Sequence, residues 1–333
     1  MVLHVDDFLI TGTDSAIAAF RTRLHNKYDM TGGLAKEYYG LNITQDNKNR
    51  VVKLSCRGFI ERAVEKLGFT PTHTFVPMDP NIVLPKYKEC KDRKMHKWYR
   101  SLVGTCSHAV VTCRPDAAQS VRALAAHLHA PGREHVDAAE KLLSYLHTTR
   151  TWALTYTGAG ATFAPLAATF YGTCDASHNV TPDAKGITGW SYHLNSGAIT
   201  WHSKQQGLTC LSSTESELVA VDSALRELRY LHELLNELGH CTKLKPTVVG
   251  QDNLSTIALC EAKHFNTRTR HLSLRYHHVG DQQRLGTIKL EYLPTNNMTA
   301  DVLTKPLYRQ AHNRHTSVLL GHKPLQWDGI ATN

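Results

Sequence analysis

The 333-residue chain lacks the features that mark several common classes of protein. It has no apolar run of about 18 residues, which a membrane-spanning helix requires. None of its 8 cysteines forms a Cys-x-x-Cys pair, so a zinc ribbon is not expected. No signal peptide precedes them, and we therefore expect reduced thiols in a protein that is not secreted.

The chain has an excess of positive charge. It carries 38 Lys and Arg against 29 Asp and Glu, a formal net charge of +9, and its 21 histidines can add to that as the pH falls. A basic surface favours a polyanionic partner, most simply a nucleic acid. A merely basic globular protein would have the same balance, so charge alone leaves both interpretations open.

The segment LHVDDFLITG, residues 3–12, places two adjacent aspartates, Asp6 and Asp7, between apolar stretches. This pattern predicts a hairpin of two buried strands with an acidic tip. Two carboxylates near a buried strand end are costly unless a cation compensates them. A metal-bound pair at a β-turn is the arrangement that a nucleotide polymerase uses, so this hairpin raises the question of a polymerase.

The rest of the first half mixes strand and helix patterns. Two strands around a polar turn at 45–50 are expected within 33–55, and the apolar spacing of 56–69 predicts a helix. The Pro- and Lys-rich stretch 77–97 is the best candidate for a linker. Further helices are expected at 98–112, 116–129 and 133–148.

Near residue 165 the pattern changes to strands alternating with helices. Strands are expected at 166–175, 246–252 and 287–295, with a hairpin at 187–203 that turns at Asn195-Ser196-Gly197. Helices are expected at 213–240, at 253–262 and from within 298–307. This order predicts an α/β region, a mixed sheet with helices covering its faces.

Four acidic residues stand at junctions between these elements, two after strands and two in first helical turns: Asp175, Asp252, Glu217 and Asp301. Strand ends in an α/β sheet gather along one edge, and helices that start near that edge bring their first turns to it. Four converged carboxylates cannot stay ionised without cations. Oxygen ligands suit Mg²⁺, and two ions about 4 Å apart would form a two-metal centre for phosphodiester cleavage.

Each acid also has a simpler structural interpretation. Glu217 could close a capping box with Thr214, and Asp252 could cap a helix. Asp301 could complement a helix dipole, and Asp175 could belong to a turn. For any one residue the simpler interpretation is favoured, and only the occurrence of all four at junctions favours a site.

Several segments resemble one known family. FYGTCDAS, LSSTESELVAV, GQDNLSTIAL, RTRHLSLRYHHVGD and ADVLTKPL are very similar to the ribonuclease H domain of copia-type LTR-retrotransposon Pol polyproteins. LHVDDFLITG, YYGLNI and YRSLVGTCSHAVVTCRPDAAQSV resemble the end of the reverse transcriptase from the same polyprotein. The resemblance runs roughly from residue 3 to residue 321.

The resemblance implies the overall organisation, α/β or α+β in class. A truncated reverse-transcriptase palm and thumb would precede a ribonuclease H-like mixed sheet with flanking helices. The implied segments are the palm end at 1–80, thumb and connection helices at 81–165, the ribonuclease H-like domain at 166–321 and a tail at 322–333.

The resemblance also implies a catalytic, metal-binding set made of Asp175, Glu217, Asp252 and Asp301. Glu217 fits the family's helix-start pattern better than its competitor Glu215. Family members often carry a histidine shortly before the last Asp, but LEYLPTNNMTAD has none, so that auxiliary role is unassigned. The implied cofactor is two Mg²⁺ ions, with Mn²⁺ as a substitute.

The implied substrate is an RNA–DNA hybrid whose RNA strand is cleaved. One Mg²⁺ would activate a water and the other would stabilise the leaving 3′ oxygen. Implied partners are nucleic acid and the other parts of the polyprotein, namely upstream polymerase and integrase, in a cytoplasmic retroelement particle or the nucleus. The alternative is a non-catalytic nucleic-acid-binding remnant of a decayed retroelement.

HVDD matches the second catalytic motif of the polymerase, usually Tyr-x-Asp-Asp, with His4 in place of the tyrosine. The family's other catalytic Asp lies well upstream in the polymerase. Asp6 and Asp7 are therefore expected to be a polymerase-motif remnant in a segment that cannot synthesise DNA alone.

The segment RTRHLSLRYHH is the best candidate for a phosphate contact outside the acidic set. The residues proposed to bind nucleic acid are Arg268, Arg270, His271 and Arg275. The histidines of this segment lack a Cys or acid at zinc spacing, so phosphate contact is favoured over zinc. Cys174, beside Asp175, is expected to be a buried strand residue rather than a nucleophile.

Overall fold

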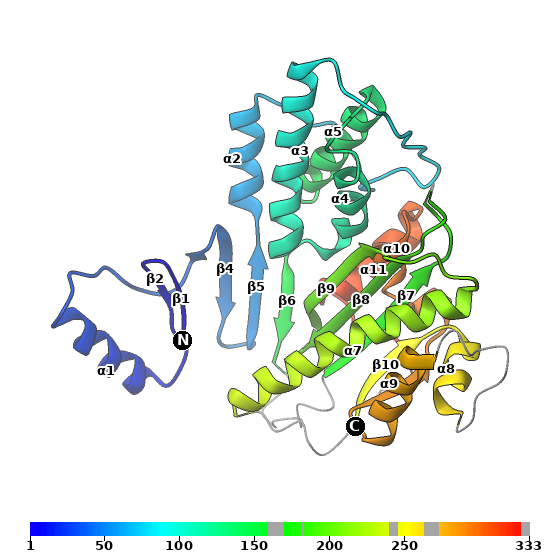
Figure 1. Cartoon of the computed structure of the whole chain (residues 1–333). Helices are drawn as coiled ribbons and strands as arrows, with labels where there is room; N and C mark the ends of the chain where they lie inside the picture. The colour runs from blue at the N-terminus through cyan, green and yellow to red at the C-terminus, as the bar shows by residue number, and fades with distance from the viewer. Residues whose placement is uncertain (159–169, 182, 240–245, 263–272, 328–333) are drawn as a thin grey trace.

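The computed structural model of the chain describes every residue except 159–169, 182, 240–245, 263–272 and 328–333. The described residues form sheets of two, four and five strands. The helices pack mainly around the larger two (Figure 1). Within the described residues, no helix is both long and apolar enough to cross a lipid bilayer.

The N-terminal hairpin pairs β1 (Val2–His4) with β2 (Asp7–Leu9), and His4 lies opposite Asp7. The predicted hairpin is confirmed, but the prediction that its strands are buried is wrong. Val2 and Leu3 are each 56% exposed, and both aspartates are exposed as well. In the described part of the chain no further strand pairs with this hairpin, and only Phe8 and Leu9 of its strands are half-buried. The following helix α1 (Asp14–His25), which the sequence analysis missed, buries no residue either (Figure 1).

The four-stranded sheet is antiparallel in the order β3 (Glu37–Tyr38), β4 (Leu41–Asp46), β5 (Val51–Ser55) and β6 (Leu154–Thr157). The strands β4 and β5 are the predicted pair around a polar turn. The strand β6 returns from the far side of the helices, so that Leu154 pairs with Leu54. The predicted boundary at residue 80 stays a prediction, although strands from either side of it share this sheet.

The helices between β5 and β6 match the predicted ones closely. They are α2 (Arg57–Leu67), α3 (Arg93–Thr112), η1 (Pro115–Ala117), α4 (Ala118–Ala125) and α5 (Arg133–Thr148). The start of α3 lies five residues before the predicted one. Asp92 explains the difference, because its side chain accepts hydrogen bonds from the N–H groups of Lys94 and Met95 and so caps the helix there.

The five-stranded sheet is mixed, as predicted. The strands β7 (Phe170–Ser177), β8 (Ile187–Leu194) and β9 (Gly197–Gln205) form an antiparallel meander, with the predicted turn at Asn195 and Ser196. The strand β10 (Thr247–Gln251) lies parallel to β7, and β11 (Ile288–Tyr292) lies parallel to β10. The strand order is therefore β9-β8-β7-β10-β11.

Helices cover both faces of this sheet. The long helix α7 (Ser213–Glu237) connects β9 to β10, and α8 (Leu254–Glu261) and α9 (Ser273–Arg284) lie between β10 and β11. These helices close one apolar core with the sheet. The short helix α10 (Asp301–Thr304) packs on β8 and β7, and α11 (Arg309–Leu319) follows it.

The second core of the sheet is shared with the first half of the chain. Ala198, Val302, Leu303, Leu319 and Leu320 lie in one buried cluster with the apolar residues of α2–α5. The helix that begins at Asp301 is therefore supported from behind by the upstream helical layer.

Candidate active site

Asp175 lies near the end of the central strand β7, opposite Gly189 on β8. The preceding residue, Cys174, is fully buried in the core below α7, as predicted, so the alternation of the strand directs Asp175 toward α10. A Cβ atom on Gly189 would lie 2.6 Å from Thr304 Cγ2. The missing side chain therefore lets α10 approach the sheet, and the Thr304 hydroxyl donates a hydrogen bond to Asp175 Oδ2.

Glu217 lies in the second turn of α7, and the capping of this helix differs from the simpler interpretation offered for it. The N-cap is Ser212, whose hydroxyl accepts from the N–H of Glu215 at 3.1 Å. Glu215 Oε2 in turn accepts from the N–H of Leu211 at 2.6 Å. Thr214 and Glu217 therefore do not form the capping box. Glu215 serves the helix start, while Glu217 is only 5% exposed.

Asp252 follows β10 directly, but it does not cap the next helix. The N-cap of α8 is Asn253, whose side chain accepts from the N–H of Thr256 at 3.0 Å. Asp252 Oδ2 instead accepts from the hydroxyl of Thr295 at 2.9 Å. Thr295 lies in η3 (Thr295–Asn297), just after β11, so the hydrogen bond joins two neighbouring strand ends.

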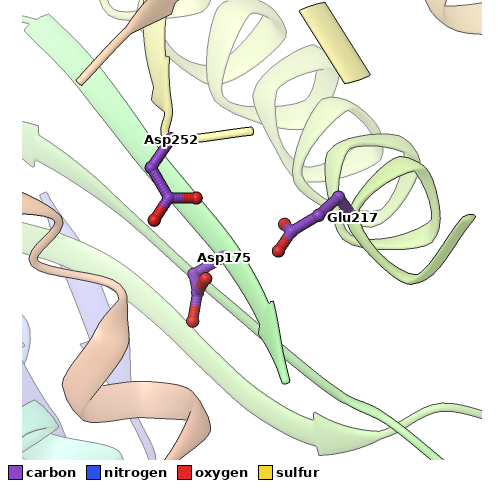
Figure 2. A group of neighbouring side chains, drawn as sticks. All are labelled: Asp175, Glu217 and Asp252. Atoms are coloured by element: carbon purple, nitrogen blue, oxygen red, sulfur yellow. The ribbon is translucent and has the colours of Figure 1, made fainter. Parts of the chain in front are cut away.

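The structure brings Asp175, Glu217 and Asp252 together. One carboxylate oxygen from each lies within 4.8 Å of the others, and the three side chains point toward one another from β7, α7 and the end of β10 (Figure 2). In the described part of the chain, this is the one group of His, Cys, Asp or Glu residues with the spacing to hold a metal ion.

The three carboxylates are poorly compensated by the protein itself. Burial raises the pKa of Glu217 well above its usual value, and the nearby Asp175 and Asp252 raise it further. The pKa of Asp252 is also raised, first by burial and then by Asp175. Glu217 and Asp252 hold their protons more tightly than free carboxyl groups, because burial and like charges outweigh the one cation that acts on Asp252, Lys305. A divalent cation bound by carboxylate oxygens would fit both the geometry and this deficit of positive charge.

Asp301, the fourth predicted acid, begins α10 and is 5% exposed. It is outside the group of three, but it interacts with Asp175. Burial and the charge of Asp175 raise its pKa to about 7, against the opposing effect of Lys305. Lys305 Nζ lies 2.8 Å from Asp301 Oδ1. The fourth acid therefore lies beside the cluster and carries its own counterion.

The other predicted site residues lie elsewhere or outside the described residues. Asp6 and Asp7 are exposed on the N-terminal hairpin. Arg275 Nε lies 3.7 Å from Asp222 Oδ2 on α7, and His278 Nδ1 lies 2.9 Å from Asp222 Oδ1. The proposed contacts Arg268, Arg270 and His271 fall outside the described residues.

Sequence reasoning missed the polar residues that surround the carboxylates. Gln251 and Thr295 lie beside the strand ends, and Thr304 and Lys305 lie on or just after α10. Gln251 and the Thr304-Lys305 pair fall inside the quoted motifs GQDNLSTIAL and ADVLTKPL, so their adjacency to predicted acids was a usable signal. Thr295 had no such signal, because its contact depends on how β11 ends beside β10.

Comparison with known proteins finds relatives among transposon polyproteins, although no protein-family model matches the chain. The chain is 32% identical over 320 residues to the retrovirus-related Pol polyprotein from transposon TNT 1-94 of Nicotiana tabacum, covering 93% of the chain and 23% of the relative. It is 30% identical over 327 residues to that from transposon RE1 of Arabidopsis thaliana, covering 95% and 21%. It therefore spans less than a quarter of the length of these relatives.

A shorter relative is covered more fully. The chain is 30% identical over 241 residues to the putative transposon Ty5-1 protein YCL074W of Saccharomyces cerevisiae, covering 68% of the chain and 73% of that protein.

Two solved structures are also similar. One is the RNase H1 LC11 isolated from compost, with 15% identity and a TM-score of 0.33. The match covers 44% of this chain and 96% of the LC11 chain. A foamy viral protease–reverse transcriptase in complex with an RNA/DNA hybrid covers 78% of the chain with 14% identity, 29% coverage of its own chain and a TM-score of 0.39. TM-scores this low do not establish a shared fold by themselves.

Proposed function

The chain belongs to the Pol polyproteins of copia-type retrotransposons, and from this premise we propose that its C-terminal half is a ribonuclease H. The enzyme would hydrolyse the RNA strand of RNA–DNA hybrids. The observation that carries the proposal is the group of buried Asp175 and Glu217 with half-buried Asp252, with one oxygen of each within 4.8 Å of the others. Its support from the sequence is that these acids appear in the order expected from the family motifs.

Asp175, Glu217 and Asp252 would hold the metal ions, and Asp301 would complete the set. We take Mg²⁺ as the cofactor, with Mn²⁺ as a substitute, because carboxylate oxygens are the donors that these hard cations prefer. When bound, two such ions would activate the attacking water and stabilise the leaving 3′ oxygen.

The chain's own residues would prepare the site in two ways. The Thr304 hydroxyl and the Thr295 hydroxyl each hold one oxygen of a carboxylate, Asp175 and Asp252 respectively, which fixes the side-chain orientations. The raised pKa values of Glu217 and Asp301 mean that cation binding would release protons from these carboxyl groups. Selectivity for RNA would come from contacts with 2′-hydroxyls and from the shape of the hybrid.

We assign no DNA synthesis to the first half of the chain alone. Asp6 and Asp7 lie on an exposed two-stranded hairpin, and His4 replaces the usual tyrosine of the motif. The remaining task of this half would be to bind the duplex through its basic residues. The partners would then be an RNA–DNA hybrid and the other polyprotein products, in a cytoplasmic retroelement particle or the nucleus.

A second candidate function is a non-catalytic nucleic-acid-binding remnant of a decayed element. The exposed hairpin favours it for the first half of the chain, and so does His4, which stands where the polymerase motif usually has a tyrosine. The carboxylate group favours the enzyme for the second half, because three clustered acids, two of them buried, are a cost to folding that a bound ion would offset.

The test is cleavage of an end-labelled RNA–DNA hybrid by the purified chain, with Mg²⁺ or with EDTA. The Asp252→Asn variant is the matched control, and a DNA duplex of the same sequence tests substrate class. We expect metal-dependent loss of the RNA strand that is absent in the variant. A folded chain that binds the hybrid but leaves it intact would favour the remnant, and cleavage of both duplexes would indicate a different nuclease.

A further inference from the structure

Gln251 is the last residue of β10 and is fully buried, directly before Asp252. A buried amide needs partners for both its oxygen and its nitrogen. Gln251 Oε1 accepts from the backbone N–H of Asn253 at 2.9 Å, and Gln251 Nε2 donates to Glu217 Oε2 at 3.1 Å. The backbone group can only donate, so the orientation of the amide is fixed by its partners.

The same amide contacts all three elements that supply the carboxylates. It contacts Glu217 on α7 and the backbone N–H of Asn253 in the turn after β10. Asp252 lies between Gln251 and Asn253 in the sequence. Its nitrogen also lies 3.5 Å from the carbonyl oxygen of Cys174 on β7, next to Asp175. One side chain therefore spans the strand, the helix and the turn whose relative positions set the distances between the three carboxylates.

The donor is also neutral. A lysine or arginine in this place would neutralise Glu217 and compete with a metal ion for it, whereas an amide holds the carboxylate without cancelling its charge. The other two carboxylates follow the same rule, since Asp175 accepts from the Thr304 hydroxyl and Asp252 from the Thr295 hydroxyl. Each of the three acids is therefore held by an uncharged donor from a different element.

We propose that Gln251 is a positioning residue of the metal site, which fixes Glu217 relative to Asp175 and Asp252 in the geometry that binds the ions. The proposal rests on the proposed ribonuclease function for its activity readout, but its primary readout is metal affinity. Loss of a residue that orients metal ligands typically costs tenfold to a hundredfold in affinity or activity. Gln251 does not touch the substrate in this role, so it is not a catalytic residue.

The test compares Gln251→Met with Gln119→Met in the full chain. Methionine keeps the length of the side chain but removes the donor, and Gln119 is a similarly buried glutamine on α4, which supplies none of the carboxylates. Mg²⁺ binding is measured by titration calorimetry, and the Mg²⁺ concentration for half-maximal hybrid cleavage is measured in parallel. We expect the Kd for Mg²⁺ to rise about tenfold in Gln251→Met alone, with an unchanged KM for the hybrid.

A Gln251→Met variant that binds Mg²⁺ within twofold of the unaltered chain overturns the proposal. If that variant does not fold, Gln251→Asn takes its place, because an amide shorter by one methylene group cannot reach both partners. We then expect a smaller rise in the Kd in the same direction. An unchanged Kd in a folded Gln251→Asn variant overturns the proposal equally.

A double-mutant cycle separates positioning from a general loss of packing. In the Glu217→Gln background, Gln251→Met should raise the Kd no further, because its effect acts through Glu217. Additive losses would overturn the proposal. A chain that binds Mg²⁺ and responds to Gln251→Met without cleaving the hybrid overturns the ribonuclease function alone. A chain that binds no Mg²⁺ overturns both.

Discussion

Two clusters of buried charge in this chain are built in opposite ways. In the helical layer, Arg114 and Asp116 are both fully buried and form two parallel hydrogen bonds, of 2.9 Å and 2.8 Å. Tyr145 donates to Asp116, and Thr149 accepts from Arg114, so each charged group has several partners. In the sheet, Asp175, Glu217 and Asp252 share a site in which every hydrogen-bond donor described above is neutral.

The pKa values of the two clusters move in opposite directions. Burial acts to raise the pKa of Asp116, but the charge and hydrogen bonds of Arg114 outweigh it and hold that pKa below its usual value. Burial and like charges hold the pKa of Glu217 well above its usual value. The first cluster is balanced within the protein, whereas the second has a deficit of positive charge that a bound cation would fill. A buried acid therefore indicates a functional site only when no cation of the protein balances its charge.

The largest expected effect comes from removing a charge from the cluster of Asp175, Glu217 and Asp252. Asp175→Asn should lower the rate of hybrid cleavage about a thousandfold, about 4 kcal/mol of transition-state stabilisation, because the central ligand of the metal site is lost. The control is Asp183→Asn, an exposed aspartate that pairs with Lys86. Single-turnover cleavage of a labelled hybrid measures the rates, and an Asp175→Asn rate within tenfold of the unaltered chain would contradict the assignment.

The same kind of substitution in the cluster of Arg114 and Asp116 should lower stability instead. Asp116→Asn leaves Arg114 buried without its counterion, which should lower the free energy of unfolding by about 3–5 kcal/mol. Urea unfolding in EDTA measures the loss. Asp252→Asn under the same conditions should leave the stability unchanged or raise it, because it removes one of three mutually repelling acids. Equal losses in the two variants would show that the clusters do not differ in the way described.

The two clusters should contribute to the pH dependence of stability in opposite directions. Unfolded carboxyl groups have a pKa near about 4, whereas the folded pKa of Asp301 is about 7 and that of Glu217 is also raised. Between these values Asp301 and Glu217 bind more protons in the folded state, so their contribution to stability without metal should fall as the pH rises from about 4 to about 7. Burial lowers the pKa of four histidines to about 4, and their contribution should rise over the same range: His127, His193, His312 and His315. Asp116 acts oppositely, and its contribution is lost only as the pH falls below the unfolded value.

Thermal unfolding in EDTA across this pH range measures the effect, at about 2–4 °C for each kcal/mol. Mg²⁺ should flatten the slope, because the ions then displace the protons, and Asp301→Asn should remove part of it. A pH profile in EDTA that Asp301→Asn leaves unchanged would contradict the raised pKa of Asp301.

The sequence predicted the strands and helices of the second half well, because their signals are local. The turn at Asn195 and Ser196 depends only on residues close in sequence, and so does the apolar stripe of α7. The acids that follow strands can be found from the same local patterns. It could not predict the buried pair of Arg114 and Asp116, because the partners of these residues come from distant helices. It also missed α1, whose weakly amphipathic sequence buries nothing.

Two of the interpretations offered above depended on what surrounds a motif. The capping role offered as the simpler interpretation of Glu217 belongs to Glu215, because the N-cap is Ser212 rather than Thr214. The strands of the N-terminal hairpin were expected to be buried because they are apolar, but apolar residues are buried only where other elements cover them. Both depend on contacts that one segment of sequence does not contain.

A smaller effect sharpens the choice between the two glutamates at the start of α7. Glu215→Gln should cost about 1 kcal/mol of stability, because it weakens the acceptor for the N–H of Leu211 at the helix start. It should leave hybrid cleavage within about twofold, as expected for a residue away from the reacting atoms. Glu217→Gln should abolish cleavage without destabilising the metal-free chain. Loss of cleavage in Glu215→Gln but not in Glu217→Gln would reverse the assignment.

The smallest effect is expected where the motif looks most like an active site. Asp6 and Asp7 are adjacent acids at a β-turn, but they are exposed on a hairpin that buries little, so water already solvates both charges. The Asp6→Asn, Asp7→Asn double variant should therefore keep hybrid cleavage within about twofold and change stability by no more than about 0.5 kcal/mol. Cleavage assays and urea unfolding measure both. A tenfold loss of cleavage would mean that the hairpin contacts the hybrid during the reaction. The exposure of an acidic pair would then no longer show that the pair has no part in cleavage.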